Sequence, residues 1–452
     1  MIIKASKHNL SGSITVPGSK SHTIRALILA TLADGTSTIS NPLPSADCLS
    51  TAAAVPLIGS EINLNPGKDG TPGNKWTVKG AGKNIHLPDD VVNVGNSGTL
   101  LYFLSAVAGN FNGISVFTGD TSIRKRPVAH VADALNQLGA RAELADPSHN
   151  GCPLIIKGPM KAGTVNTPGE ISSQYISGLM ISAILLNGKL TLNLSNPKET
   201  PYLTMTQKWM EKVGVPCYIS DDFKKIEVEG PANLKAFDVT IPSDWEGVAF
   251  PLIAALMTDS EITIENVDSS GTQGDDVIVE VLKSIGADIE WDKTKDTLTV
   301  RGGKKARNGH GKLSTKHLPG GELHVTMNAF PDAICALAAI ACITEGTVVL
   351  EDAEVCRRKE TDRLKVLNIE LTKMGAKVEE KQDALIIHGG APLRGGVVES
   401  YHDHRMAMSL ACLGLALPEG EVLEIKDAEC CSVSFPGFFE VMNEKLGASF
   451  SK

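Results

Sequence analysis

The residues best placed to do chemistry lie in one short stretch near the N-terminus, just before an apolar segment at residues 26–32. The stretch reads Pro17-Gly18-Ser19-Lys20-Ser21-His22-Thr23-Ile24-Arg25. Its proline and glycine end a short extended run, so Ser19 predicts the N-cap of a helix. The free backbone N–H groups and the positive end of the helix dipole would then face whatever lies beside Lys20. With Arg25 one turn further on, the stretch predicts a binding site for an anion.

The same arrangement, polar residues followed by an apolar helix, occurs five more times. The polar residues are Asn96-Ser97-Gly98-Thr99, Ser172-Ser173-Gln174, Ser243-Asp244, Pro331-Asp332 and His402-Asp403-His404-Arg405. A second signature follows each of the six about 40 to 45 residues later, namely an amphipathic helix ending in glycine before a short strand. These glycines are Gly59, Gly139, Gly214, Gly286, Gly375 and Gly447. Glycine suits the left-handed residue that closes a helix, and six paired matches in register predict an internal repeat.

The repeats predict an α/β fold with sheets packed around buried apolar helices. A chain of 452 residues is too long for one ordinary core, so two or more domains are expected. A strand followed by proline and a capping residue occurs at residues 14–19 and again at residues 239–244. We interpret these as two crossovers between domains. The predicted domains are residues 18–241, with three repeats, and residues 1–17 plus 242–452, with the other three.

Composition and charge exclude several classes of protein. An apolar content of 42% with 21% charged residues describes a soluble globular chain, and the net charge of −9 opposes a nucleic-acid binder with a broad basic face. The longest apolar run, residues 406–417, is too short to span a bilayer, and no secretory segment opens the chain. Nine cysteines without C-x-x-C pairs fit a reducing cytoplasm and indicate no metal site.

The predicted architecture already suggests the kind of substrate. If the apolar helices run alike in each domain, their N-termini collect on one face. Two such faces opposed across the crossovers would form a cleft of strong positive potential with few counter-anions. A substrate with several negative charges would suit that cleft.

Several motifs occur in the order found in enolpyruvyl transferases, and the chain resembles that family from about residue 9 to 440. The motifs are Pro17-Gly18-Ser19-Lys20-Ser21, Gly95-Asn96-Ser97-Gly98-Thr99, Arg126-Pro127, Ser172-Ser173-Gln174, Lys359-Glu360-Thr361-Asp362-Arg363-Leu364 and Asp403-His404-Arg405-Met406-Ala407-Met408. The resemblance implies two domains of three βαβαββ units each, with buried parallel helices like an inverted α/β barrel, closing over the substrates. It also implies transfer of the enolpyruvyl group of phosphoenolpyruvate to a hydroxyl, with release of phosphate. No metal or organic cofactor is expected, and we expect a monomer.

The resemblance assigns six residues to the donor, phosphoenolpyruvate. They are Lys20, Gly98, Arg126, Gln174, Arg363 and Arg405. The chemistry is consistent with this, because the donor carries a phosphate next to a carboxylate and planar guanidinium groups bind both bidentately. Gly98 would let the backbone approach the donor closely.

The resemblance likewise assigns the acceptor and the proton-transfer groups. The acceptor residues are Lys20, Ser21, Arg25, Ser172, Ser173, Gln174, Asp332 and Lys359. Asp332 and Glu360 match the catalytic positions, with Lys20 or His404 as helpers, and such a group typically contributes about 10²–10⁴-fold. Some of these residues also have a purely structural interpretation. Asp332, Ser172 and Ser173 could cap helices, and Glu360 could be a surface partner of an arginine.

Four positions depart from the pattern of the family. Tyr102 stands where an arginine is usual, Glu199 where a serine binds the acceptor phosphate, Val355 where an asparagine binds the acceptor, and Val433 where a lysine contacts the donor phosphate. Most donor residues are intact, so the donor chemistry is better supported than the acceptor.

The leading hypothesis is therefore transfer to the 5-hydroxyl of shikimate 3-phosphate, by addition and elimination, on the pathway to chorismate and the aromatic amino acids. The alternative is another acceptor, possibly unphosphorylated, because Glu199 would place a carboxylate against a phosphate unless Lys198 or Arg25 neutralises it. The cell-wall branch, with UDP-N-acetylglucosamine as acceptor, uses a cysteine in the loop at residues 119–127, and none is present here. A third hypothesis, an RNA-end phosphate cyclase, is disfavoured because the nucleotide signature of such enzymes is absent from this chain. A non-catalytic repeat scaffold is disfavoured because polar residues recur at helix starts.

Overall fold

The computed structural model describes residues 1–68, 70–307 and 311–452. The chain forms two compact units, one of Gly18–Pro242 and the other of Met1–Pro17 with Ser243–Lys452. We refer to them as the inserted unit and the terminal unit. Each contains three sheets and its own hydrophobic core.

The inserted unit has three four-stranded sheets, each combining one parallel and two antiparallel strand pairs. Its strands are β3 (Asp34–Ser40), β4 (Glu61–Asn63), β5 (Lys75–Ala81), β6 (Val92–Asn93), β7 (Gly113–Thr118), β8 (Arg141–Leu144), β9 (Leu154–Gly158), β10 (Thr164–Thr167), β11 (Gly188–Leu194), β12 (Cys217–Ile219), β13 (Lys225–Gly230) and β14 (Asp238–Thr240). Its helices are α1 (Lys20–Leu32), α2 (Ala46–Ala54), α3 (Gly98–Ala108), α4 (Ala129–Gln137), α5 (Ser173–Ser182) and α6 (Thr200–Lys212).

The terminal unit has two four-stranded sheets and one three-stranded sheet. Its strands are β1 (Ile3–Ser6), β2 (Ser11–Thr15), β15 (Glu261–Glu265), β16 (Asp288–Asp292), β17 (Thr297–Arg301), β18 (Glu322–Thr326), β19 (Gly346–Glu351), β20 (Lys377–Glu380), β21 (Leu385–Gly389), β22 (Gly396–Glu399) and β23 (Val422–Lys426). Its helices are α7 (Trp245–Leu256), α8 (Ile278–Ser284), α9 (Ile334–Ala341), α10 (Arg363–Lys373), α11 (His404–Gly414) and α12 (Phe438–Leu446).

One repeat shows how each sheet is built. In the sheet of order β10-β11-β13-β12, the buried helix α5 connects the parallel strands β10 and β11. The chain then continues through α6 into the antiparallel strands β12 and β13. This βαβαββ order confirms the predicted α/β class and repeat unit.

The repeat glycines have the predicted backbone conformation. Gly59, Gly139, Gly214, Gly286, Gly375 and Gly447 all have positive φ, between 70° and 104°. A residue with a Cβ adopts this region at a cost, which explains why glycine recurs there. The helix-closing prediction is confirmed at all six positions.

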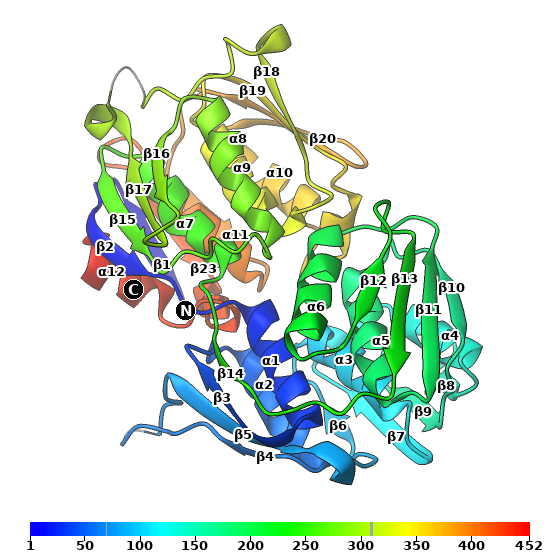
Figure 1. Ribbon diagram of the computed structural model, residues 1–452. Helices are drawn as coiled ribbons and strands as arrows, with labels where there is room; N and C mark the ends of the chain where they lie inside the picture. Colours follow the sequence, from blue (N-terminus) through cyan, green and yellow to red (C-terminus); the bar gives the residue numbers. More distant parts are fainter. Residues whose placement is uncertain (69, 308–310) are drawn as a thin grey trace. The chain divides into compact units, whose positions relative to one another are not determined.

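The central helices are buried on every side, and most of their residues are apolar. In α9 and α11 every residue is buried, and so is every residue of α1 from His22 to Leu32. Figure 1 shows α1, α3 and α5 lying against the sheets of the inserted unit, and α7, α9 and α11 within the terminal unit. None of the helices in the described ranges is long and apolar enough to cross a membrane.

The chain crosses between the units twice, and the strand before each crossover pairs within the unit that the chain is leaving. Strand β2 precedes α1 in sequence but pairs in parallel with β15 of the terminal unit. Strand β14 precedes α7 but pairs in parallel with β3 of the inserted unit. Strand β1 pairs antiparallel with β23, near the other end of the chain. Both ends of the sequence therefore contribute to one unit.

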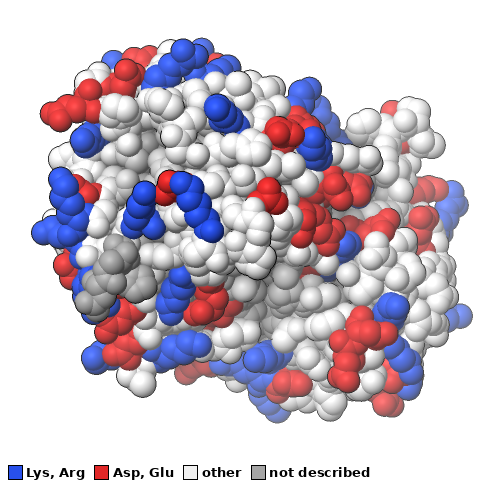
Figure 2. Space-filling view, turned by 90° about the horizontal axis from the view of Figure 1, so that it is seen from above, with Lys and Arg blue, Asp and Glu red and all other residues white. Residues whose placement is uncertain are grey.

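One face of the molecule carries both acidic and basic side chains. Figure 2 shows Lys and Arg interspersed with Asp and Glu on the face that it presents.

Candidate active site

Arg25 is a buried cation inside the inserted unit. Its side chain is fully buried in α1, and its guanidinium lies 5.0 Å from the centre of the Phe103 ring. It donates hydrogen bonds to Oγ1 of Thr206 at 2.9 Å and to Oγ of Ser177 and the carbonyl of Tyr202, each at 3.3 Å. No carboxylate of the described residues pairs with it, and burial lowers the pKa of Arg25 to about 9. A buried guanidinium held by neutral groups is well suited to bind an anion.

The N-terminus of α5 lies next to Arg25. Ser172 caps this helix by accepting a hydrogen bond from the backbone N–H of Gln174 at 3.2 Å. The Gln174 side chain donates to Oγ of Ser173 at 3.1 Å, and its Oε1 accepts from Arg25 at 3.5 Å. The structure therefore brings four of the predicted acceptor residues together.

Glu199 lies at the same helix terminus. Its Oε2 accepts hydrogen bonds from the backbone N–H of Ser173 at 3.0 Å and from the Ser173 hydroxyl at 3.1 Å. The residue is 3% exposed, and its φ of 52° is a left-handed conformation that glutamate seldom adopts. Neutralisation of this carboxylate by a neighbouring cation, Lys198 or Arg25, stays a prediction.

Lys20 is the first residue of α1, and its Nζ lies 3.5 Å from Oδ2 of Asp47 at the start of α2. Ser19 occupies the N-cap position as predicted, although its side chain makes no capping hydrogen bond. Ser21 follows within the first turn, and its carbonyl accepts a hydrogen bond from Arg25 at 3.1 Å. The first turn of α1 therefore holds Lys20, which is paired with Asp47, and the carbonyl of Ser21, which accepts a hydrogen bond from Arg25.

Gly98 and Arg126 are neighbours in the inserted unit. Gly98 begins α3, and a Cβ there would lie 3.1 Å from Nη1 of Arg126. Arg126 follows the short helix η3 (Ile123–Lys125), and its Nη2 donates to Oδ1 of Asn96 at 3.5 Å. Glycine at position 98 therefore leaves room for the guanidinium beside the start of α3.

The departing positions have structural roles in their own units. The Tyr102 hydroxyl donates to the carbonyl of Pro127 at 3.2 Å, and burial raises the pKa of Tyr102 to about 12. Val355 packs at the edge of the terminal core, and Val433 ends the short helix η10 (Ala428–Val433).

In the terminal unit, Arg363 is surrounded by three carboxylates. It is fully buried at the start of α10. Its Nη1 lies 2.6 Å from Asp332, its Nη2 2.7 Å from Glu360, and its Nε 2.8 Å from Asp403. The two predicted proton-transfer residues are thus held by one guanidinium.

Asp332 is the centre of this cluster. It lies in the short helix η8 (Pro331–Ala333), 3.5 Å from Nζ of Lys359 and 3.3 Å from Nε of Arg405. Burial alone would raise the pKa of Asp332, but Lys359, Arg405 and Arg363 together hold it well below its usual value. Asp332 is therefore ionised at neutral pH.

Arg405 pairs closely with Glu246 at the start of α7, and both side chains are buried. Asp275, in the short helix η5 (Gly274–Val277), is also buried. Burial and then the charge of Glu246 raise the pKa of Asp275 well above its usual value. The expectation of few counter-anions is therefore wrong for this unit, because its buried cations are already matched by carboxylates.

Sequence reasoning missed the partners that hold the predicted residues. They are Asp47 beside Lys20, Thr206 and Ser177 beside Arg25, and Asp403 and Glu246 beside the two arginines. Asp403 belongs to a recognised motif and could have been assigned. Glu246 is 159 residues from Arg405, and no spacing in the sequence connects them.

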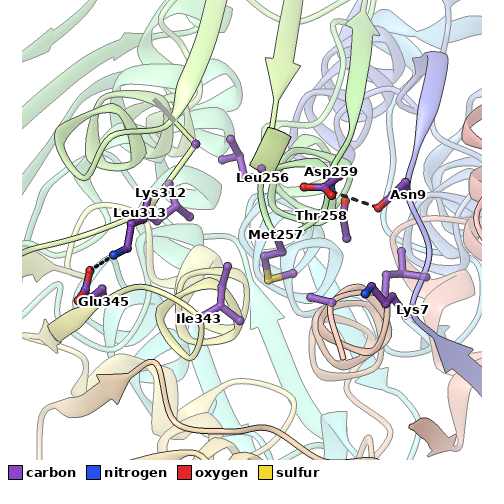
Figure 3. Close-up of a pocket in the computed structure, with 14 residues that line it drawn as sticks. Lys7, Asn9, Leu256, Met257, Thr258, Asp259, Lys312, Leu313, Ile343 and Glu345 are labelled. Atoms are coloured by element: carbon purple, nitrogen blue, oxygen red, sulfur yellow. Dashed lines mark hydrogen bonds and ion pairs between the residues drawn. The ribbon is translucent and has the colours of Figure 1, made fainter. Parts of the chain in front are cut away.

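The terminal unit also contains a cavity of about 340 Å³ that none of these residues lines. Figure 3 shows Leu256, Met257 and Ile343 around it, with Lys312 paired to Glu345 at 2.8 Å. The cavity lies at the C-terminal ends of α7, α9 and α11, whereas Asp332 and Arg405 lie at N-terminal ends. It is thus separate from the candidate site.

Comparisons with known proteins agree over the whole chain. The family model described as EPSP synthase (3-phosphoshikimate 1-carboxyvinyltransferase) matches residues 4–442. Relatives named 3-phosphoshikimate 1-carboxyvinyltransferase are 36% identical: that of Ruminiclostridium cellulolyticum over 97% of both chains, and that of Methanocaldococcus jannaschii over 99% of both. The solved EPSP synthase of Acinetobacter baumannii matches with a TM-score of 0.80 and 26% identity, covering 100% of both chains. The chain therefore belongs to the EPSP synthase (3-phosphoshikimate 1-carboxyvinyltransferase) family.

Proposed function

We propose that this protein transfers the enolpyruvyl group of phosphoenolpyruvate to the 5-hydroxyl of shikimate 3-phosphate and releases phosphate. The observation that carries the proposal is the cluster around Asp332, a carboxylate kept ionised by Lys359, Arg363 and Arg405. Membership of the family supports the same reaction. No finding supports a different, unphosphorylated acceptor.

The chemistry proceeds by addition and elimination. Asp332 takes the proton of the acceptor hydroxyl as the hydroxyl oxygen bonds to C2 of the donor. Glu360, in its protonated form, supplies a proton to the donor methylene. Glu360 then takes back a proton from the new methyl group as phosphate leaves C2 with the proton held by Asp332, and the double bond is restored. The arginines stabilise the negative charge of the phosphate group as it leaves.

The assignment of binding residues follows the resemblance to the family. The donor's phosphate and carboxylate are assigned to Lys20, Gly98, Arg126, Gln174, Arg363 and Arg405. The acceptor is assigned to Lys20, Ser21, Arg25, Ser172, Ser173, Gln174, Asp332 and Lys359. A monomeric state and a cytoplasmic location stay predictions from the sequence.

The test of the proposal is release of phosphate from phosphoenolpyruvate with a panel of acceptors. We expect release with shikimate 3-phosphate and none with UDP-N-acetylglucosamine. A clear preference for unphosphorylated shikimate would show that the acceptor is wrong while the donor chemistry stands.

Replacing Arg126 should weaken binding of the donor. Each charge-assisted hydrogen bond contributes about 1.5–3 kcal/mol, so Arg126→Ala should raise the Kd for phosphoenolpyruvate about tenfold or more. Calorimetry with the acceptor site filled by an analogue that lacks the 5-hydroxyl measures this Kd without turnover. Arg124→Ala is the matched control, because Arg124 donates to the carbonyl of Gly119 at 2.8 Å and has no assigned substrate. Equal affinities in the two variants would remove Arg126 from the donor site.

Replacing Glu199 should change the affinity for the acceptor. In Glu199→Ser the backbone N–H and hydroxyl of Ser173 lose their resident carboxylate and become available to the acceptor phosphate. We expect the KM for shikimate 3-phosphate to fall about tenfold, as one charge-assisted contact predicts, with little change in kcat. Glu199→Gln keeps the size of the side chain and removes its charge, so it separates the effect of charge from that of size. If wild type preferred shikimate and Glu199→Ser reversed that preference, Glu199 would instead define an unphosphorylated acceptor site.

A further inference from the structure

The cations assigned to the donor in the terminal unit are already paired with carboxylates. Arg363 pairs with Asp332, Glu360 and Asp403, and Arg405 with Glu246 and Asp332. The donor is itself a multiple anion. If every carboxylate stayed ionised and in place, the donor would enter a site whose positive charge is already matched, at a high electrostatic cost.

Of the two carboxylates on Arg405, Glu246 is the one that can be exchanged. Asp332 also holds Arg363 and lies near Lys359, so its removal would disturb the whole cluster. Glu246 lies in the first turn of α7 and is not paired with Arg363. A ligand carboxylate or phosphate on Arg405 would be the chemical equivalent of the Glu246 carboxylate.

Asp275 provides a second carboxyl group next to Glu246. It is 5% exposed, and its buried Oδ1 has no hydrogen-bond partner. The charged groups that act on it are Glu246 and Asp244 of α7, Asp332 of η8 and Arg405 of α11. Burial and these carboxylates raise the pKa of Asp275 well above its usual value, so a second negative charge beside Glu246 is disfavoured here.

We propose, on the basis of the function proposed above, that Glu246 is a resident counter-anion of Arg405 which the donor displaces, and that Glu246 takes up one proton from solvent as it leaves. A displaced Glu246 would otherwise be a buried charge without its cation, which is costly. Once protonated, it can share a hydrogen bond with Asp275. Binding of the donor and binding of a proton are therefore linked.

The linkage has a defined sign. Since protonation of Glu246 favours the donor-bound state, the donor must raise the proton affinity of Glu246 by the same factor. As the pH rises, donor affinity should fall by up to tenfold per pH unit for one proton taken up. In Glu246→Gln, which cannot ionise, this part of the pH dependence should be lost.

Calorimetry can count the proton directly. Phosphoenolpyruvate is titrated into enzyme whose acceptor site holds the analogue without the 5-hydroxyl, at pH 8, in buffers of different ionisation enthalpy. The slope of the observed heat against that enthalpy gives the number of protons taken up. We expect wild type to take up one proton more than Glu246→Gln, and the variant to bind the donor about tenfold more tightly at pH 8. Glu261→Gln, whose carboxylate pairs with Arg301 at 3.0 Å on the surface, should match wild type.

The outcomes separate this proposal from its alternatives. Equal proton numbers in wild type and Glu246→Gln would overturn it. Weaker donor binding in Glu246→Gln with an unchanged proton count would also overturn it, because it would show that Glu246 positions Arg405 and is not displaced. If wild type did not bind phosphoenolpyruvate at all, the proposed function would fail instead.

Discussion

Asp332→Asn should lower the turnover number by about 10²–10⁴-fold while both substrates still bind. Asparagine has nearly the same size and keeps an oxygen for Arg363, but it cannot take the proton of the acceptor hydroxyl. Steady-state kinetics gives kcat, and calorimetry gives the affinity for each substrate. A fall in kcat and kcat/KM by the same factor is the sign of an interaction made in the transition state.

The control for this variant is an ion-paired aspartate outside the cluster. Asp288 on β16 is 6% exposed and pairs with Arg307 at 3.0 Å. Asp288→Asn should leave turnover unchanged even if it costs stability. Wild-type turnover in Asp332→Asn would reduce Asp332 to a partner of the arginines.

Arg363→Met should have the largest effect on stability. The substitution removes the guanidinium shared by Asp403, which is buried, and by Asp332 and Glu360, which are partly buried. Removal of one partner from a buried ion pair costs roughly 3–5 kcal/mol. Urea unfolding should show this loss in the transition of the terminal unit, and Arg358→Ala, whose exposed pair with Glu354 is worth about 0–1 kcal/mol, is the control.

A double variant checks the cause. Asp403 pairs with Arg363 through both of its oxygens, at 2.8 and 3.3 Å. If uncompensated charge is what destabilises Arg363→Met, adding Asp403→Asn should restore part of the loss. An additive further loss would point to packing instead.

The stability of the protein should also depend on pH through Asp332. Because the folded state holds the pKa of Asp332 below its usual 3.8, the ionised carboxylate stabilises the fold above that pH. This stability is lost as the pH falls towards the pKa of the folded state.

The sequence was informative wherever the local backbone decides the structure. Gly59 and Gly447 were predicted to close helices, and both are left-handed, because that position favours the residue without a Cβ. Ser172, Asp244 and Asp403 cap helices at the predicted polar starts. Periodicity and capping are local, and local rules apply to a single sequence.

The counter-ions could not be predicted because they depend on contacts between distant repeats. Glu246 precedes an apolar helix and reads as an ordinary acidic residue in a first turn. Nothing in its neighbours indicates that Arg405 lies against it. Buried arginines require carboxylates, yet sequence gives no rule for which ones. For the same reason the sequence did not indicate Thr206, a threonine inside α6 that accepts a hydrogen bond from Arg25.

The pairing of β1 with β23 affects the order in which the chain can fold during synthesis. All residues of the inserted unit have been made once the ribosome passes Pro242, so that unit can fold as a continuous segment. Strand β2 must wait for β15, and β1, where Ile3 lies opposite Ile425, must wait for almost the entire remainder. At ~5–20 residues per second, residues 243–452 take ~10–40 s to make. The apolar residues Ile3, Ala5 and Ile14 stay without their final partners for that time, so the first strands synthesised are among the last to be buried.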